Sequence, residues 1–139
     1  MSEQIATGGC LCGAVRYRVS GPPRALSLCH CASCRRAAGG PSLAWAIFPE
    51  DKVDILSGEI TVFESSPGVT RGFCARCGTS LTYARANRPG LFDVTTGSLD
   101  DPGAFAPTKE IWTEERLSWV TPHPALPQFD QFSIQRPNP

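Results

Sequence analysis

Hydrophobic runs of β-strand character recur along the chain, and in one of them hydrophobic and charged residues alternate, the spacing of a β-strand with one buried face. In that run Val15, Tyr17 and Val19 alternate with two arginines. Segments rich in glycine or proline separate further runs of this kind, and only residues 33–38 suggest a short helical turn. The sequence therefore predicts a mainly β fold of short antiparallel strands with little helix. The other expected strands are 42–48, 52–56, 59–65, 69–73, 79–84, 91–99, 108–112 and 116–120.

The length of the chain fits one hydrophobic core. At 139 residues we expect a single domain over 1–139, because two cores would each be too small. From residue 121 onward prolines become frequent, which predicts a tail, 121–139, that straps across the surface or frays. We find no internal repeat and no linker to a second domain.

Charge and hydropathy restrict the possible partners. The formal net charge is zero and no basic stripe is present, which argues against nucleic acid as a partner. The polar first residues lack the basic and apolar segments of a signal peptide, and no apolar run approaches the length of a membrane span. We therefore expect a cytoplasmic protein with no membrane partner. The sequence does not indicate the oligomeric state.

Seven cysteines carry most of the candidate chemistry. In a reducing compartment, closely spaced cysteines favour metal binding over disulfides, and an odd number leaves one thiol unpaired in any all-disulfide scheme. Thiolates separated by one or two residues can converge on one zinc ion, at about 2.3 Å from it. The sequence therefore predicts metal binding by three groups of cysteines. They are Cys10 and Cys12, then Cys29, Cys31 and Cys34, and finally Cys74 and Cys77.

Two glycines suggest how these ligands divide between ions. Gly13 and Gly78 each follow the second cysteine of an outer pair, where a backbone with positive φ can turn beside a metal ion. This similarity favours a closed four-thiolate site made of the two outer pairs, a type that is usually structural. The central group then keeps three ligands and an open fourth position, the arrangement of catalytic zinc. Spacing alone does not settle this division, since any four of the seven cysteines could share one ion.

Three further residues lie close to the central group. His30 lies between two predicted ligands, and in so tight a turn we expect its side chain to point away from the metal. Arg35 and Arg36 follow the last cysteine of the group directly. They could bind a carboxylate of a substrate, or they could only balance the negative charge of the thiolates.

Five segments, in this order, resemble one known family: “GGCLCGAVRYRV”, “CHCASCRR”, “TRGFCARCGTSL”, “TGSLDDP” and “EIWTEERLSW”. The family is that of the glutathione-dependent formaldehyde-activating enzymes, which also includes the centromere protein V domain. The resemblance covers about residues 8–120. It implies a zinc-bearing all-β fold called the β-tent, which is also found in methionine-R-sulfoxide reductases.

The resemblance also implies two zinc ions per chain, one structural and one at an active site. The family's structural ligands correspond to Cys10, Cys12, Cys74 and Cys77, and its active-site ligands correspond to Cys29, Cys31 and Cys34. The implied activity is that of a carbon–sulfur lyase, in which glutathione and formaldehyde give S-hydroxymethylglutathione.

This chemistry suits an open zinc site. A thiol that enters the open position would lose its proton, and the thiolate is the form that attacks an aldehyde carbon. A small-molecule thiol and an aldehyde are therefore the expected partners, with Arg35 or Arg36 holding a carboxylate of the thiol. Two alternatives stay open: a zinc-stabilised β binding module without catalysis, and a thiol redox enzyme of the same fold.

Overall fold

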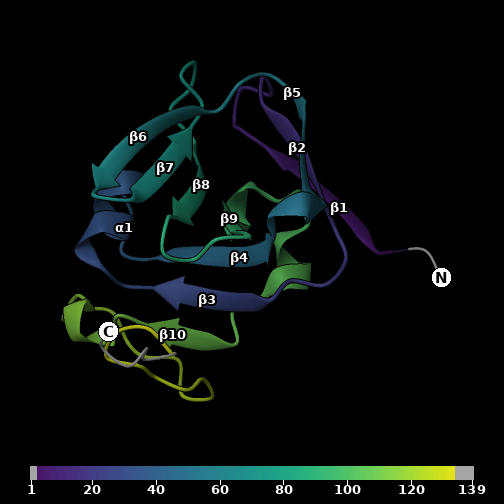
Figure 1. Cartoon of the computed structure of the whole chain (residues 1–139). Helices are drawn as coiled ribbons and strands as arrows, with labels where there is room; N and C mark the ends of the chain where they lie inside the picture. Colours follow the sequence, from purple (N-terminus) through teal and green to yellow (C-terminus); the bar gives the residue numbers. More distant parts are fainter. Residues whose placement is uncertain (1–2, 134–139) are drawn as a thin grey trace.

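Residues 3–133 are described by a computed structural model, in which the strands form two sheets (Figure 1). The smaller sheet has the order β1-β2-β5, with β1 (Ile5–Gly9), β2 (Arg16–Ser20) and β5 (Val53–Ser57) all antiparallel. The larger sheet has seven strands in the order β10-β3-β4-β9-β8-β7-β6. Its pairs are antiparallel apart from β10 and β3. The strands are β3 (Ala25–Cys29), β4 (Leu43–Pro49), β6 (Thr61–Ser66), β7 (Val69–Phe73), β8 (Ser80–Arg85), β9 (Leu91–Thr95) and β10 (Lys109–Ile111).

The helical part of the described chain is small. Its one α-helix, α1 (Ala32–Ala38), lies where the sequence suggested a helical turn and ends at Gly39 in the left-handed conformation, with φ 68°. Residues 3–133 also contain four short 3-10 helices: Glu50–Lys52, Thr96–Ser98, Pro102–Phe105 and Thr113–Glu115. The expected fold class, mainly β with little helix, is confirmed. No helix within residues 3–133 has the length and apolar character needed to cross a bilayer.

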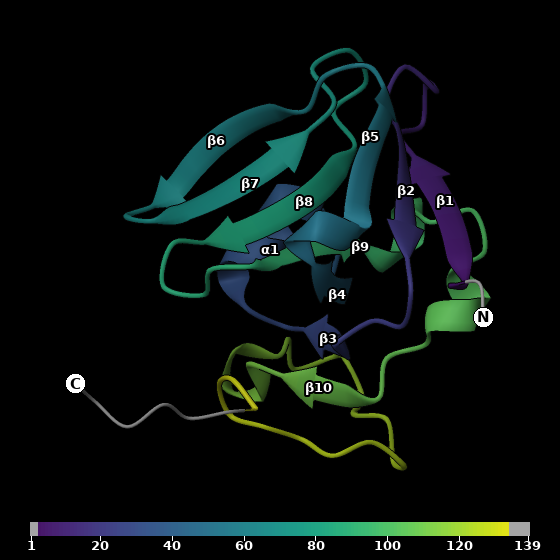
Figure 2. The same ribbon diagram turned by 45° about the vertical axis from the view of Figure 1, so that its right-hand side comes forward.

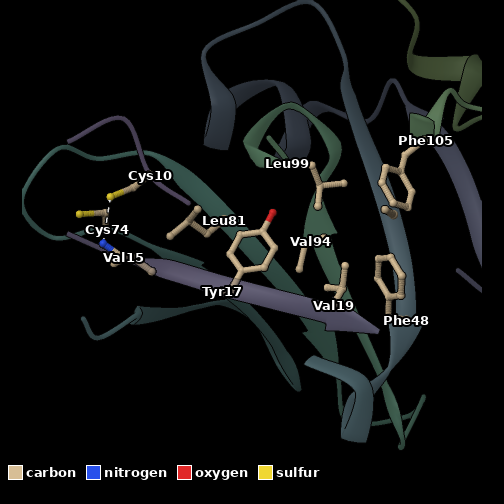
Figure 3. Close-up of a cluster of buried hydrophobic side chains, with 11 residues drawn as sticks. Cys10, Val15, Tyr17, Val19, Phe48, Cys74, Leu81, Val94, Leu99 and Phe105 are labelled. Carbon is tan, nitrogen blue, oxygen red and sulfur yellow. Dashed lines mark hydrogen bonds between the residues drawn. The ribbon is translucent and has the colours of Figure 1, made fainter. Parts of the chain in front are cut away.

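The core lies between the two sheets. Val15, Tyr17 and Val19, which were expected on one buried face, are indeed buried, the last two within β2. They pack in one cluster with residues of β4, β8 and β9 (Figure 3). Phe48 of β4 meets Phe105 edge to face, with 6.1 Å between ring centroids. Figure 2 shows β5, β2 and β1 side by side, next to the end of the larger sheet. The larger sheet therefore buries one face in this core, and its other face is available for a site.

The described part of the proline-rich tail lies along β10. The Glu110 N–H donates to the Pro127 carbonyl at 3.0 Å, and the Phe129 N–H donates to the Glu110 carbonyl at 3.0 Å. Figure 2 shows this yellow segment below β10. Residues 121–133 therefore strap across the surface, as one of the two expectations had it, whereas 134–139 lie outside the described residues.

One expected strand, 116–120, is wrong. These residues form a turn in which the Val120 N–H donates to the Leu117 carbonyl at 3.0 Å, and Trp119 is 71% exposed. The local pattern resembled a strand, but the sheet edge nearest in the sequence, that of β10, is not available to it. β10 is the outermost strand of the larger sheet, and the tail already bonds to its free side.

Phe48→Ala should lower the free energy of unfolding by about 3–5 kcal/mol, because it removes a ring that is 0% exposed and leaves a cavity at the centre of the core. Phe63→Ala is the matched control. Its ring is 63% exposed, so we expect a change within about 0.5 kcal/mol. Urea unfolding of both variants measures the difference, and equal losses would contradict the described core.

Candidate functional site

The two outer cysteine pairs meet at one end of the core. Cys10 and Cys12 lie in the turn between β1 and β2, and Cys74 and Cys77 lie in the turn between β7 and β8. Their four sulfurs lie within 4.8 Å of one another, with 3.6 Å from Cys10 to Cys12 and 3.8 Å from Cys12 to Cys74. Figure 3 shows Cys10 and Cys74 next to each other at the edge of the core. A tetrahedral zinc ion with Zn–S bonds of about 2.3 Å places its sulfurs about 3.8 Å apart. The four thiols therefore fit a tetrahedral metal ion.

Each turn contains one of the two glycines identified in the sequence analysis. Gly13 has φ 82° and Gly78 has φ 80°, a region that residues with a side chain rarely adopt. Their N–H groups close the turns on the carbonyls of Cys10, at 3.1 Å, and Cys74, at 2.7 Å. The resemblance between the two turns, which motivated the division of the ligands, is therefore present in the backbone.

Hydrogen bonds favour the thiolate form at two of these cysteines. The Val15 N–H donates to Cys10 Sγ at 3.2 Å, which lowers the pKa of that thiol. The Thr79 hydroxyl, 3.1 Å from Cys77 Sγ, lowers the pKa of Cys77 to about 5. Since the thiolate is the metal ligand, these contacts prepare the cluster for an ion.

The central cysteines form a second cluster. Cys29 ends β3, Cys31 caps the N-terminus of α1, and Cys34 lies in its first turn. Their three sulfurs lie within 4.8 Å of one another, so this group could also hold a metal ion. The three thiols leave one corner of a tetrahedron open. All seven cysteines are free thiols, as expected.

Cys34 is the most strongly stabilised thiolate of this cluster. The neighbouring thiols of Cys29 and Cys31 lower its pKa through hydrogen bonds. The Trp45 indole N–H also donates to its sulfur at 3.4 Å, and an Arg71 guanidinium nitrogen lies 3.6 Å away. The same sharing of protons raises the pKa of Cys29. Negative charge on the cluster is therefore concentrated next to Arg71.

The three-cysteine cluster opens into a cavity of about 810 Å³. The cavity lies on the face of the larger sheet that points away from the core, because its lining residues alternate with core residues along β4 and β9. Cationic side chains outnumber acidic ones in the lining, at five to two. They are Arg24, Arg71, Arg85, Arg88 and Lys109, against Asp93 and Glu115.

Aromatic rings hold three of the cations in place. The guanidinium of Arg71 lies 5.0 Å from the centre of the Tyr83 ring, and that of Arg88 lies 5.9 Å from it. Arg85 lies over Phe132, at 4.2 Å, and Phe132 in turn packs edge to face on Trp112. The C-terminal segment therefore forms part of the cavity wall.

The structure brings the seven predicted ligands into two groups but places the two predicted arginines elsewhere. Arg35 and Arg36 lie in the last turn of α1 and do not line the cavity. Their role in binding a substrate stays a prediction. Sequence reasoning missed Arg71 and Arg85. Their only signals were a charged residue within the predicted strand 69–73 and one directly after the predicted strand 79–84.

His30 lies on the opposite side of its turn from the cavity. Cys29 and Cys31 line the cavity, whereas His30 does not and is not a member of the metal cluster. Its imidazole is fully buried, and Nε2 lies 2.6 Å from Glu110 Oε1. The expectation that His30 points away from the ligands agrees with this geometry.

Comparison with known proteins identifies the family. Residues 5–115 match the family described as glutathione-dependent formaldehyde-activating enzyme. The chain belongs to this family. The resemblance noted in the sequence is thereby confirmed, and the matched residues contain all seven cysteines.

Two proteins with known names are similar in sequence to this chain. A Halomonas elongata protein named putative glutathione-dependent formaldehyde-activating enzyme is 29% identical over 126 residues, which cover 84% of this chain and 80% of that protein. A Schizosaccharomyces pombe protein named as an uncharacterized lyase is 32% identical over 80 residues, 58% of each chain. A crystal structure of a Rhodobacter sphaeroides protein has a TM-score of 0.57 at 21% identity, covering 88% of this chain and 98% of that one. This last likeness concerns the fold alone.

Asp93 is the buried acid of the cavity. It lies on β9 next to Arg88, with which it forms an ion pair. Burial raises its pKa to about 6, and the charge of Arg88 offsets only part of that effect. The carboxylate is thus harder to ionise in the folded protein than in the unfolded chain.

Asp93→Asn should make the stability less dependent on pH. In the wild-type protein the carboxyl group titrates near pH 6 when folded and near 3.8 when unfolded, so its contribution falls as the pH rises between these values. Relative to the variant, the wild-type free energy of unfolding should fall by about 1 kcal/mol from about pH 5 to about pH 7. Urea unfolding at several pH values measures this, and parallel curves for the two proteins would contradict it.

Proposed function

We propose that this protein is a zinc-dependent enzyme of the carbon–sulfur lyase type, which joins a thiol such as glutathione to formaldehyde or a related small aldehyde. The observation that carries the proposal is the three-cysteine cluster, which lacks one tetrahedral ligand and borders a cavity of about 810 Å³. A closed, four-ligand cluster would have no position for a substrate. Membership of the family supports the same reaction.

The two clusters take different roles in this proposal. The four-cysteine cluster holds a structural zinc ion that ties the β1–β2 turn to the β7–β8 turn. Cys29, Cys31 and Cys34 hold the catalytic ion. When bound, that ion would accept a thiol at its fourth position and lower the pKa of that thiol.

The residues around the three-cysteine cluster suit the charge changes of the reaction. The thiol loses a proton, and its sulfur forms a bond to the aldehyde carbon while the C=O π bond breaks and its electron pair moves to oxygen. That oxygen takes up a proton to give a hemithioacetal, which is the S-hydroxymethyl adduct when the aldehyde is formaldehyde. Negative charge passes from sulfur to oxygen during this step. The guanidinium of Arg71, held over Tyr83 and 3.6 Å from Cys34 Sγ, lies where it can stabilise that charge.

The cationic lining suits a thiol that carries carboxylates, as glutathione does. Arginine binds carboxylates through two parallel hydrogen bonds. Arg85 lines the cavity between β8 and the C-terminal segment, whereas Arg35 and Arg36 lie outside the lining. We therefore assign the binding of substrate carboxylates to the cavity arginines, Arg85 first.

The two clusters should differ when one ligand is removed. The purified wild-type protein should carry two zinc ions per chain, measured by elemental analysis under reducing conditions. Cys74→Ser opens the structural site, so the protein should become insoluble or lose its cooperative thermal unfolding, because a structural zinc supplies much of the folding energy of a small domain. Cys31→Ser should stay folded and carry one ion.

One ion or none in the wild-type protein would remove the proposed catalytic site. Equal damage in the two variants, or greater damage in Cys31→Ser, would reverse the assigned roles.

Arg85→Gln should raise the KM for glutathione by about tenfold or more in the formation of its formaldehyde adduct, because one charged hydrogen-bonding partner of the carboxylate is lost. The spontaneous reaction is subtracted, and zinc content is measured for each variant. Arg36→Gln is the matched control and should keep the wild-type KM.

The opposite result, with Arg36→Gln impaired and Arg85→Gln normal, would favour the carboxylate-binding role predicted for Arg35 and Arg36. If the protein does not accelerate the reaction of any small thiol with formaldehyde, and thiols leave the visible spectrum of the cobalt-substituted protein unchanged, the binding-module interpretation replaces the enzyme.

A further inference from the structure

Glu110 is a fully buried carboxylate that no step of the proposed reaction uses. It lies in the middle of β10 and is 1% exposed. Lys109 and Ile111 on either side line the cavity, but Glu110 does not, since alternate residues of a strand point to opposite faces. A buried carboxylate is costly unless several donors reach it, so this residue requires an explanation.

The first oxygen of Glu110 bonds to the turn that carries the central cysteines. His30 Nε2 lies 2.6 Å from Glu110 Oε1, and both side chains are buried from solvent. The backbone N–H of His30 also donates to the backbone carbonyl of Ile111 at 3.1 Å. The residue between Cys29 and Cys31 is thus bonded to β10 through its backbone and through its side chain.

The second oxygen bonds to the C-terminal segment. Glu110 Oε2 accepts hydrogen bonds from the His123 N–H at 2.8 Å and from the Gln128 amide at 2.6 Å. Burial disfavours the charged form, but the donors from Gln128, His123 and His30 outweigh it and lower the pKa of Glu110. The carboxylate is therefore ionised and can only accept, which makes His30 Nε2 the donor in their contact.

We propose that Glu110 is a positioning residue for the three-cysteine site, which it controls by holding His30 on the far side of the turn. This inference rests on the proposed binding of a metal ion by that site. With the imidazole fixed away from the cavity, the backbone directs the Cys29 and Cys31 thiols to the cavity side, toward Cys34. His30 is therefore an anchor of the turn and does not ligate the metal.

The geometry distinguishes this role from general stabilisation. A contact that only stabilised the fold could lie anywhere in β10, whereas this one is made to the single residue between two ligands. Partners that orient ligands in this way typically change metal affinity by about 10- to 100-fold when they are removed. The effect should therefore appear at the three-cysteine site and not at the four-cysteine site.

The test follows zinc release from the intact protein to a coloured chelator, with each variant compared at the same interval below its own melting temperature. In His30→Ala, the ion of the three-cysteine site should leave about tenfold faster or more, while the other ion leaves at the wild-type rate. His30→Gln can still donate to Glu110 and should recover most of the loss. Glu110→Leu should behave as His30→Ala.

Gln128→Leu is the matched control. It removes a donor to the other oxygen of the same carboxylate without touching the turn, and its release rates should stay within about threefold of wild type, well below the tenfold effect of an orienting partner. In the cobalt-substituted protein, His30→Ala should shift the visible absorption of the three-cysteine site and Gln128→Leu should not. If Glu110→Leu does not fold, the comparison of His30→Ala, His30→Gln and Gln128→Leu still tests the positioning role.

The positioning role is wrong if His30→Ala releases zinc at the wild-type rate, or if Gln128→Leu accelerates zinc release as much as His30→Ala does. Either result leaves the proposed enzyme function intact. A wild-type protein that carries only one ion overturns both the positioning role and the catalytic site.

Discussion

The alternation of side chains between the two faces of β4 and β9, in the middle of the seven-stranded sheet, is the constraint on which the rest of the structure depends. Ala46 and Phe48 of β4 lie in the core, while Trp45, on the opposite face of the strand, lines the cavity. The Trp45 indole N–H donates to Cys34 Sγ. A shift of one residue in the pairing would exchange the two faces and place charged side chains in the core. Gly72 shows how tightly the pairing is set, since a Cβ there would collide with the hydroxyl of Thr82. The core and the cavity therefore lie on opposite faces of the same sheet.

The two cysteine clusters use this arrangement differently. The four-cysteine cluster joins turns of both sheets, and its ligands Cys12 and Cys74 are 62 residues apart in the sequence. The three-cysteine cluster is local, since its ligands span the end of β3 and the first turn of α1. What makes the second cluster suitable for chemistry comes from distant strands: Trp45 on β4, Arg71 on β7 and the hydrogen-bonded His30–Glu110 pair on the far side. An ion in the four-cysteine cluster would hold the two sheets together, and an ion in the three-cysteine cluster would face the cavity.

Much of this organisation could be predicted from the sequence because it is encoded locally. Short spacing of the cysteines and the glycines after two of them favoured the division of the ligands that the two clusters have, and the alternation of Val15, Tyr17 and Val19 indicated a buried face. The cavity could not be predicted, because Arg71 and Arg85 reach it only through the register of β7 and β8. The strand expected at 116–120 failed for a related reason. Whether an alternating segment pairs depends on a free sheet edge, and the C-terminal segment takes that edge of β10.

The wall that Phe132 forms has a consequence for how substrate range could diverge among related chains. This part of the cavity is built by residues after 121, which supply no thiol to either cluster. Phe132 contacts Trp112 and Arg85, so a different residue there, or a different length of the segment, would reshape one side of the cavity without altering a single metal ligand. A change in the C-terminal segment would therefore alter the shape of the cavity while leaving all seven cysteines in place.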